Sequence, residues 1–154
     1  MNNPDPHAAN GKPTRANFQR FQSIDTRWAD NDIYGHVNNV TYYAYFDTAV
    51  NQFLISDGGL DIHQGASIAF VVDSQCSYLQ PLSFPEKIDV GLAVTKLGHS
   101  SVTYKLGIFK ENNNMLCAHG HFVHVFVARD NQRPCPIPEK IRRALTLLKE
   151  NTHR

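Results

Sequence analysis

The chain has 154 residues, of which 42% are hydrophobic and 19% are charged, and its formal net charge at pH 7 is +1. This length fits one domain with a buried core. A near-neutral charge does not suit a nucleic acid or an anionic membrane as a partner. No apolar run approaches the ~20 residues that span a bilayer, so we expect neither a membrane protein nor a nucleic-acid-binding protein.

The N-terminal residues are polar, include Pro4, Pro6 and Pro13, and lack the apolar core of a signal peptide. We interpret residues 1–15 as a flexible leader and residues 16–150 as one domain. The three cysteines are odd in number and lack metal-type spacing, which is typical of reduced thiols. We therefore expect a cytoplasmic protein without a metal site.

The first predicted elements are a strand and a long helix. Residues 16–28 alternate well enough to predict a strand, with the apolar side chains on even positions. After a loop around Asp32, residues 39–56 predict a helix, because apolar side chains recur there at spacings of three and four. Gly58 and Gly59 follow, as expected for a left-handed C-terminal cap. This helix is apolar on several sides, so we expect a sheet to wrap around it.

The remainder of the chain is predicted to form strands and a closing helix. The expected strands cover residues 67–73, 75–79, 86–97, 102–108 and 117–129, and the helix covers residues 139–150. Residues 75–79 either continue the strand over residues 67–73 or pair with it. One strand, one long helix and then four or five antiparallel strands form an α+β arrangement. A twisted antiparallel sheet of five to six strands would curl around the apolar helix.

The most informative stretch joins the first strand to the long helix. It contains the carboxylates Asp30 and Asp32, followed by Gly35 at a point suited to a sharp turn, since glycine takes positive φ without a Cβ clash. Asn38 and Asn39 can each cap the helix, whose N-terminal amides favour developing negative charge. A carboxylate close to such amides predicts an acyl-transfer centre.

The same stretch carries a family signature. Asp30-Asn31-Asp32, then Gly35-His36-Val37-Asn38-Asn39, then Tyr42, resembles the signature of the 4-hydroxybenzoyl-CoA thioesterase-like branch of the hotdog-fold superfamily. The glycine–histidine–valine–asparagine–asparagine core is its specific part. The resemblance extends over about residues 18–143 and implies a hotdog fold. It also implies acyl-CoA thioesterase activity without a cofactor, coenzyme A being part of the substrate.

The resemblance suggests chemical roles for three residues. It places the catalytic carboxylate at Asp32, which would attack the thioester carbonyl or activate a water, unless it merely closes the turn. It places His36 in the catalytic network, although a buried histidine that bonds backbone across a dimer interface is an equal alternative. It makes the N–H of Asn39 the donor to the oxyanion.

Four nearby residues receive other expectations. Tyr34 and Gly35 should contact the substrate. Plant acyl-carrier-protein thioesterases have an asparagine at the position of Tyr34, so their asparagine-assisted chemistry is not carried over. Asp30 lies at a strand end and should hydrogen-bond the loop instead of acting as a second acid. Asp47 is shorter than the helical glutamate that another hotdog branch uses as its catalyst, and we expect it to be structural.

Relatives hold the coenzyme A phosphates with basic residues at a hairpin and near the end of the fifth strand. The corresponding residues here are Lys96, His99, Ser100, Ser101, Arg129 and Arg133. They bind the substrate in this interpretation, or they are simply solvated. His119 and His121 share a strand face but lack a third ligand, so we expect a surface pair and no bound metal.

The last long strand has apolar side chains on both faces, and a curled sheet leaves an edge that needs cover. We therefore expect a homo-oligomer, either a dimer or a homotetramer, with the acyl-CoA site at the subunit interface as the resemblance implies. The alternative function is a hotdog protein that binds acyl-CoA or acyl-carrier protein without hydrolysing it. The sequence does not select one acyl group.

Overall fold

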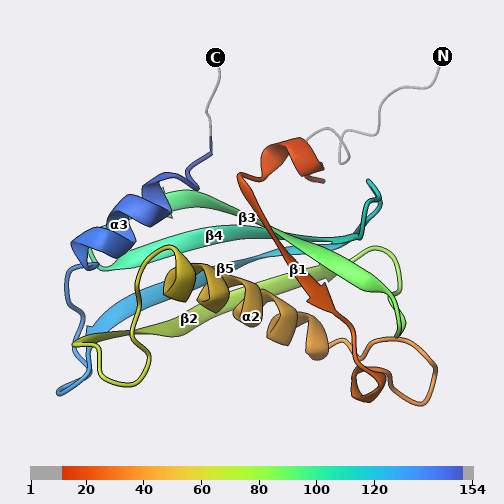
Figure 1. The fold of residues 1–154 in the computed structure, drawn as a ribbon, viewed down its shortest axis with the longest axis horizontal. Helices are drawn as coiled ribbons and strands as arrows, with labels where there is room; N and C mark the ends of the chain where they lie inside the picture. The colour runs from red at the N-terminus through yellow and green to blue at the C-terminus, as the bar shows by residue number, and fades with distance from the viewer. Residues whose placement is uncertain (1–11, 151–154) are drawn as a thin grey trace.

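A five-stranded antiparallel sheet curls around one long helix in the computed structural model, which describes residues 12–150 (Figure 1). The strands are β1 (Arg20–Asp25), β2 (Ser67–Tyr78), β3 (Lys87–Leu97), β4 (Ser101–Lys110) and β5 (Leu116–Ala128). The helices are α2 (Thr41–Ser56) and α3 (Glu139–Thr146), with 3-10 turns η1 (Arg15–Asn17) and η2 (Trp28–Asp30). The strand order β1-β3-β4-β5-β2 leaves β1 and β2 at the edges. The predicted hotdog fold is confirmed; residues 1–11 of the predicted leader lie outside the described residues.

Helix α2 buries one face against the sheet. Its buried side chains, spaced three and four apart, are Tyr42, Tyr45, Phe46, Ala49, Val50, Phe53 and Leu54. On β3 the facing side chains are Ile88, Val90, Leu92 and Val94, all fully buried. Full burial of one large apolar side chain contributes about 1.5–3 kcal/mol, so this interface contributes substantially to the stability of the fold. Gly59, with a φ of +68°, ends the helix by the predicted left-handed turn.

The first strand is shorter than the alternating pattern indicated. The predicted strand over residues 16–28 placed Phe18, Ile24 and Trp28 on even positions, but the structure does not keep them on one face. Phe18 is buried on the sheet face away from α2, Ile24 packs against the main core, and Trp28 is 74% exposed. The turns η1 and η2 flank β1 and end its period of two, so even positions do not stay on one side.

Phe18 occupies a position that two glycines make available. A Cβ at Gly91 would lie 2.6 Å from the Phe18 ring, and one at Gly107 would lie 2.7 Å from it. With Ala93 and Phe109, Phe18 forms a second, smaller core on the outer face of the sheet. The segment that precedes β1 therefore covers part of the sheet.

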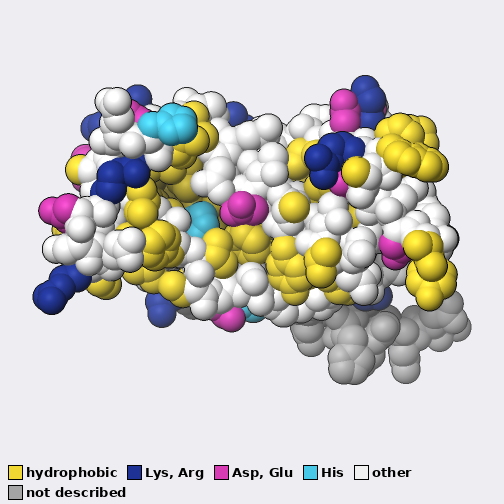
Figure 2. All heavy atoms as spheres, turned by 90° about the horizontal axis from the view of Figure 1, so that it is seen from below, with side chains coloured by type: hydrophobic (Ala, Val, Ile, Leu, Met, Phe, Trp, Pro, Cys, Tyr) yellow, Lys and Arg dark blue, Asp and Glu magenta, His cyan; other side chains and the backbone are white. Residues whose placement is uncertain are grey.

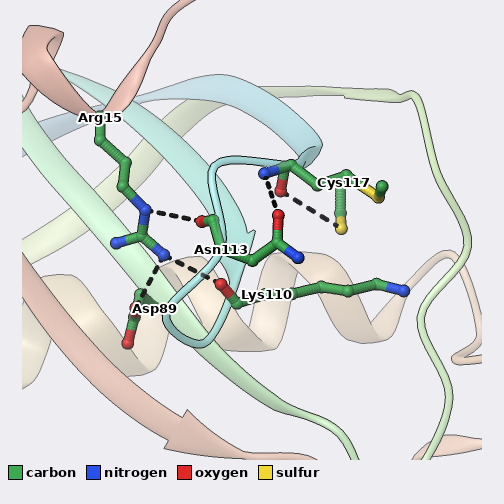
Figure 3. A network of polar contacts seen from close by, with 6 residues as sticks. Arg15, Asp89, Lys110, Asn113 and Cys117 are labelled. Carbon is green, nitrogen blue, oxygen red and sulfur yellow. Dashed lines mark hydrogen bonds and ion pairs between the residues drawn. The ribbon is translucent and has the colours of Figure 1, made fainter.

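Arg15 fastens this segment to the sheet (Figure 3). Its guanidinium donates to the carbonyl oxygens of Asn113 at 2.7 Å and Lys110 at 2.9 Å, and to the carboxylate of Asp89 at 2.9 Å. The same group lies 4.9 Å from the ring centroid of Phe109. Arg15 thus joins the chain before β1 to β3 and to the turn between β4 and β5.

Edge strand β2 is continuous, which confirms the first of the two predicted options, that residues 75–79 continue the strand over residues 67–73. It pairs with β5 along its whole length, with a register shift between Val71 and Asp73. The intervening Val72 forms a bulge, which lets one strand pass through the break in alternation. Phe70, Val71 and Val72 are 39%, 44% and 59% exposed, so the edge of the sheet carries apolar side chains into solvent.

Helix α3 covers the far end of the sheet. It ends four residues before the predicted residue 150, and it buries Ile141, Ala144 and Leu145. The Arg142 guanidinium donates to the carbonyl oxygens of Gly98 and His99, which ties α3 to the β3–β4 hairpin. In the described part of the chain neither helix combines the length and apolar character needed to cross a membrane.

Candidate active site

The loop between η2 and α2 closes on itself. Asn31 and Val37 form an isolated antiparallel bridge, and within it the N–H of Asp32 donates to the carbonyl of His36 at 2.9 Å. The N–H of Gly35 donates back to the carbonyl of Asp32 at 3.1 Å. Gly35 has a φ of +83°, which confirms the sharp turn predicted there. We call residues 31–38 the Asp32 loop.

The Asp32 loop rests on the segment that precedes β3. The buried Val37 donates its N–H to the carbonyl of Leu82 at 2.8 Å. The Ser83 hydroxyl donates to the carbonyl of Gly35 at 2.9 Å. These contacts place the loop beside the start of β3, at one end of the sheet (Figure 1).

A pocket of about 370 Å³ opens where the Asp32 loop meets α2 and the end of β2. Its lining includes Asp32, Tyr34, His36, Asn39, Tyr42 and Tyr78. The structure therefore brings the three residues predicted to be catalytic together with Tyr34, and Gly35 holds the turn beneath them. The volume falls in the usual range for small-molecule sites.

Asp32 uses one carboxylate oxygen for the turn and leaves the other available. Oδ1 accepts the N–H of Tyr34 at 2.8 Å, which is the turn-closing role that the sequence offered as an alternative. Oδ2 has no hydrogen-bond partner among residues 12–150. The side chain is half-buried, and the His36 and Asn39 residues beside it are exposed. Asp32 can therefore close the turn and still face a ligand.

The start of α2 differs in part from the predicted capping. The Asn38 side chain accepts the N–H of Val40 at 3.2 Å, but Val40 is the N-cap residue and its side chain makes no cap. The Asn39 side chain does not cap the helix either. The N–H of Asn39 has no acceptor among residues 12–150. A free amide at the positive end of the helix dipole is suited to bind an oxyanion.

Two tyrosines form one wall of the pocket: Tyr42, which belongs to the signature but received no predicted role, and Tyr78, which sequence reasoning did not identify. The rings of Tyr42 and Tyr78 lie 4.9 Å apart and nearly perpendicular, and the Tyr78 hydroxyl donates to the carbonyl of Asn39 at 3.0 Å. Burial raises the pKa of Tyr42 and of Tyr78 to about 12, so both are neutral donors near pH 7. Tyr78 comes from the end of β2 and belongs to no local motif, so no sequence pattern predicted its contacts with Tyr42 and Asn39.

Asp30 is buried and turned away from the pocket. Its carboxylate accepts the Tyr45 hydroxyl at 2.7 Å and the N–H of Arg27 at 2.8 Å. The sequence predicted a hydrogen-bonding role for Asp30, and this arrangement supplies it. The partners are the residues before the Asp32 loop and the helix after it.

The residues expected to bind coenzyme A lie at the opposite end of the chain's sheet. Lys96, His99, Ser100 and Ser101 belong to the β3–β4 hairpin and its flanks, and Arg129 and Arg133 follow β5. β3 spans 11 residues, so its two ends are about 30 Å apart at the usual rise per residue. One chain therefore does not bring these residues to Asp32.

A second, mainly apolar cavity of about 680 Å³ lies at this far end. It is bounded by the end of α2, the start of β2 and residues 135–141. Because α2 has 16 residues, the cavity is about 24 Å along the helix from the pocket beside Asp32.

Several solved structures resemble this chain. The PA5185 protein of Pseudomonas aeruginosa strain PAO1 is 55% identical, with a TM-score of 0.89, over 92% of this chain and 99% of that one. The PA2801 protein of Pseudomonas aeruginosa, named as a candidate thioesterase, is 30% identical, with a TM-score of 0.78, over 83% and 98%. A DHNA-CoA thioesterase from Staphylococcus aureus is 26% identical, with a TM-score of 0.68, over 75% and 78%.

A curated relative and a family profile complete the comparison. The YsmA protein of Bacillus subtilis (strain 168) is 25% identical over 89 residues, which are 58% of this chain, and the match spans 60% of the length of that relative. The profile of the Thioesterase-like superfamily matches residues 26–145. That range is most of the chain and contains the Asp32 loop, α2 and strands β2 to β5. The chain belongs to the Thioesterase-like superfamily, as its signature predicted.

Proposed function

We propose that this chain hydrolyses acyl-CoA thioesters to a free acid and coenzyme A. The observation that carries the proposal is the placement of the Asp32 carboxylate and the free N–H of Asn39 in one pocket at the start of α2. Membership of the superfamily supports thioester hydrolysis in general. The activity named for the Staphylococcus aureus relative supports coenzyme A as the thiol part of the substrate.

In the proposed reaction the thioester carbonyl oxygen accepts the N–H of Asn39, where the helix dipole stabilises the developing negative charge. Asp32 then acts in one of two ways. It attacks the carbonyl carbon, coenzyme A leaves as a thiolate and takes a proton, and water hydrolyses the resulting anhydride. Alternatively, Asp32 takes a proton from a water as that water attacks, and the proton passes to the leaving thiolate. Both routes regenerate the carboxylate.

The other pocket residues have supporting roles in this proposal. His36 is exposed beside Asp32, where it can orient the thioester or the attacking water. Tyr34 and Gly35 form the rim that the substrate passes. The reaction as proposed uses no metal and no cofactor. We place the protein in the cytoplasm, because its three cysteines are free thiols.

The proposal includes a homo-oligomer joined along β2. An edge strand of 12 residues with exposed Phe70, Val71 and Val72 is a template for pairing with another chain. The face that carries α2 and β2 shows hydrophobic side chains over much of its length, with an acidic group and a histidine near its middle and other charged groups towards its ends (Figure 2). A second copy related by a two-fold axis would cover this face and satisfy the open edge.

Such pairing also accounts for the separation of the predicted site residues. Antiparallel β2 strands would bring the Ser67 end of one chain towards the Tyr78 end of the other. Tyr78 lines the Asp32 pocket, whereas Ser67 pairs with Ala128 beside Arg133 and the β3–β4 hairpin. In the proposed oligomer, dimer or tetramer, the acid comes from one subunit and the coenzyme A contacts come from its partner.

Thiol release tests the proposed activity. Purified protein is incubated with a panel of acyl-CoA esters and a thiol-reactive dye, and binding of each ester is measured by calorimetry. Continuous release over many turnovers per site, for at least one ester, is the expected result. Binding of esters without release would favour the alternative function, a non-catalytic acyl-CoA-binding protein. Neither binding nor release across short, long and aromatic acyl groups would contradict both.

A further inference from the structure

Asp30, which immediately precedes the Asp32 loop, carries a buried carboxylate. Asp30 is 3% exposed, and isolated burial of a carboxylate is costly unless hydrogen bonds compensate it. Here both oxygens are satisfied. Oδ2 accepts the Tyr45 hydroxyl and the Arg27 N–H, at 2.7 and 2.8 Å, and Oδ1 accepts the Arg27 side chain at 3.0 and 3.1 Å. Asp30 is thus fully engaged and cannot serve the pocket directly.

The backbone of Asp30 closes the base of the loop. Its carbonyl oxygen accepts the N–H of Asn38 at 2.9 Å. This bond joins Asp30, which immediately precedes the Asp32 loop, to Asn38, the last residue of the loop. Asp32 lies two residues after Asp30, and Asn39 follows Asn38. The position of Asp30 therefore sets the separation between the carboxylate and the amide that the proposed reaction uses.

Tyr45 connects this base to α2. It belongs to the second turn of the helix and is buried, and its hydroxyl is directed at Asp30. Burial raises the pKa of Asp30, but the hydrogen bonds from Tyr45 and Arg27 outweigh burial and leave that pKa below its ordinary value. Burial and the bond to Asp30 raise the pKa of Tyr45. The pair therefore keeps one protonation state across neutral pH.

We propose that Asp30 and Tyr45 are positioning residues, which hold the Asp32 carboxylate and the Asn39 N–H at the separation that the reaction needs. The inference rests on the proposed thioesterase function and goes beyond it. Neither residue touches the substrate. Displacement of a reacting group by about 1 Å can cost about 10²-fold in rate, so a loosened base should lower turnover more than substrate affinity.

The test compares Tyr45→Phe with Tyr104→Phe. Both changes remove one buried hydroxyl and keep the ring, but the Tyr104 hydroxyl has no partner among residues 12–150. We expect Tyr45→Phe to lower kcat about tenfold with KM within about twofold, because one of the hydrogen bonds that hold the Asp30 carboxylate is lost. Tyr104→Phe should leave both constants unchanged. Amide hydrogen exchange at Asn38 should accelerate in Tyr45→Phe and not in Tyr104→Phe.

Two further comparisons distinguish a positioning role of Tyr45 from a general loss of stability and from failure of the proposed function. Ile108→Val, a buried change in β4, provides a variant of moderately lowered stability. If Tyr45→Phe keeps the wild-type kcat, or loses no more than an Ile108→Val protein of equal stability, the positioning role is refuted. If wild-type protein hydrolyses no acyl-CoA, the proposed function fails instead. In that case, unchanged amide exchange at Asn38 in Tyr45→Phe still refutes the proposal that Tyr45 and Asp30 hold the base of the loop, and faster exchange supports it.

Discussion

The Tyr78 hydroxyl donates to the carbonyl oxygen of Asn39 at 3.0 Å and thereby ties the end of β2 to the start of α2. Asn39 also supplies the N–H that we propose as the oxyanion donor. The contact therefore links an edge strand, where a second subunit is proposed to pair, to the amide at which charge would develop. In the proposed oligomer, Tyr78 would connect the subunit contact to the proposed oxyanion site.

Removal of this hydroxyl tests the link. In Tyr78→Phe the ring still packs against Tyr42, but the Asn39 carbonyl loses its donor. A hydrogen bond of this kind contributes about 0.5–1.5 kcal/mol, so kcat should fall roughly three- to tenfold while the fold is retained. Steady-state kinetics with the best acyl-CoA ester, beside a thermal melt, measures both. An unchanged kcat would mean that Tyr78 only packs against the pocket.

The stability of the protein should depend on pH through His124. This side chain is 1% exposed, and burial lowers its pKa from 6.5 to about 4. Below pH 6.5 the unfolded chain binds a proton that the folded chain excludes, so the free energy of unfolding falls as the pH drops towards 4. The shift corresponds to about 3 kcal/mol.

Urea unfolding at pH 7, 5.5 and 4 measures this dependence, and His124→Phe is the comparison. Phenylalanine has no proton to bind, so the variant should lose about 3 kcal/mol less than wild type over the same range. Equal losses in the two proteins would show that other groups control the acid sensitivity.

The open edge of β2 predicts an oligomer that one charge can disrupt. Wild-type protein should scatter light as a dimer or larger at micromolar concentration. Val71→Lys places a charge on the exposed edge and should shift the population towards monomer, since edge charges oppose strand pairing. Leu147→Lys is the control, because Leu147 is 77% exposed on another surface. A monomeric wild type would contradict the proposed assembly.

Subunit mixing tests whether two chains share each site. One parent carries Asp32→Asn, and the other carries Ser101→Trp, which blocks the β3–β4 hairpin about 30 Å away from Asp32 in the same chain. If the sites are shared, some mixed dimers recover one intact site from two inactive parents. Absence of recovery, despite demonstrated exchange and an inactive Ser101→Trp parent, would argue that each chain builds its site alone.

The parts of the fold that the sequence predicted well are those with local patterns. The stripe of α2 is visible because its contacts recur every three or four residues. Asp32, His36 and Asn39 lie within eight positions of one another, so a short closed loop was enough to bring them into one pocket. Gly35 likewise needed only its own backbone freedom.

The predictions that were wrong or incomplete depend on contacts between distant segments. The alternating pattern placed Phe18 in the first predicted strand. Its burial on the outer face of the sheet depends on Gly91 and Gly107, more than 70 positions later in the chain. Tyr78 reaches the pocket because β2 ends beside α2, which follows from the sheet order. Periodicity describes a segment's own faces and contains no information on which other segment will cover them.

Asp32 is the residue proposed to perform the chemistry, and turnover by Asp32→Asn tests this role most directly. The substitution keeps the shape of the side chain and an oxygen for the Tyr34 N–H, but it removes the base or nucleophile. Asp47→Asn, on the exposed side of α2, is the matched control. We predict that Asp32→Asn lowers kcat by roughly 10²-fold or more with much of the substrate affinity retained, while Asp47→Asn stays near wild type. Near-normal turnover in a folded Asp32→Asn protein would contradict the account and direct attention to Asp47.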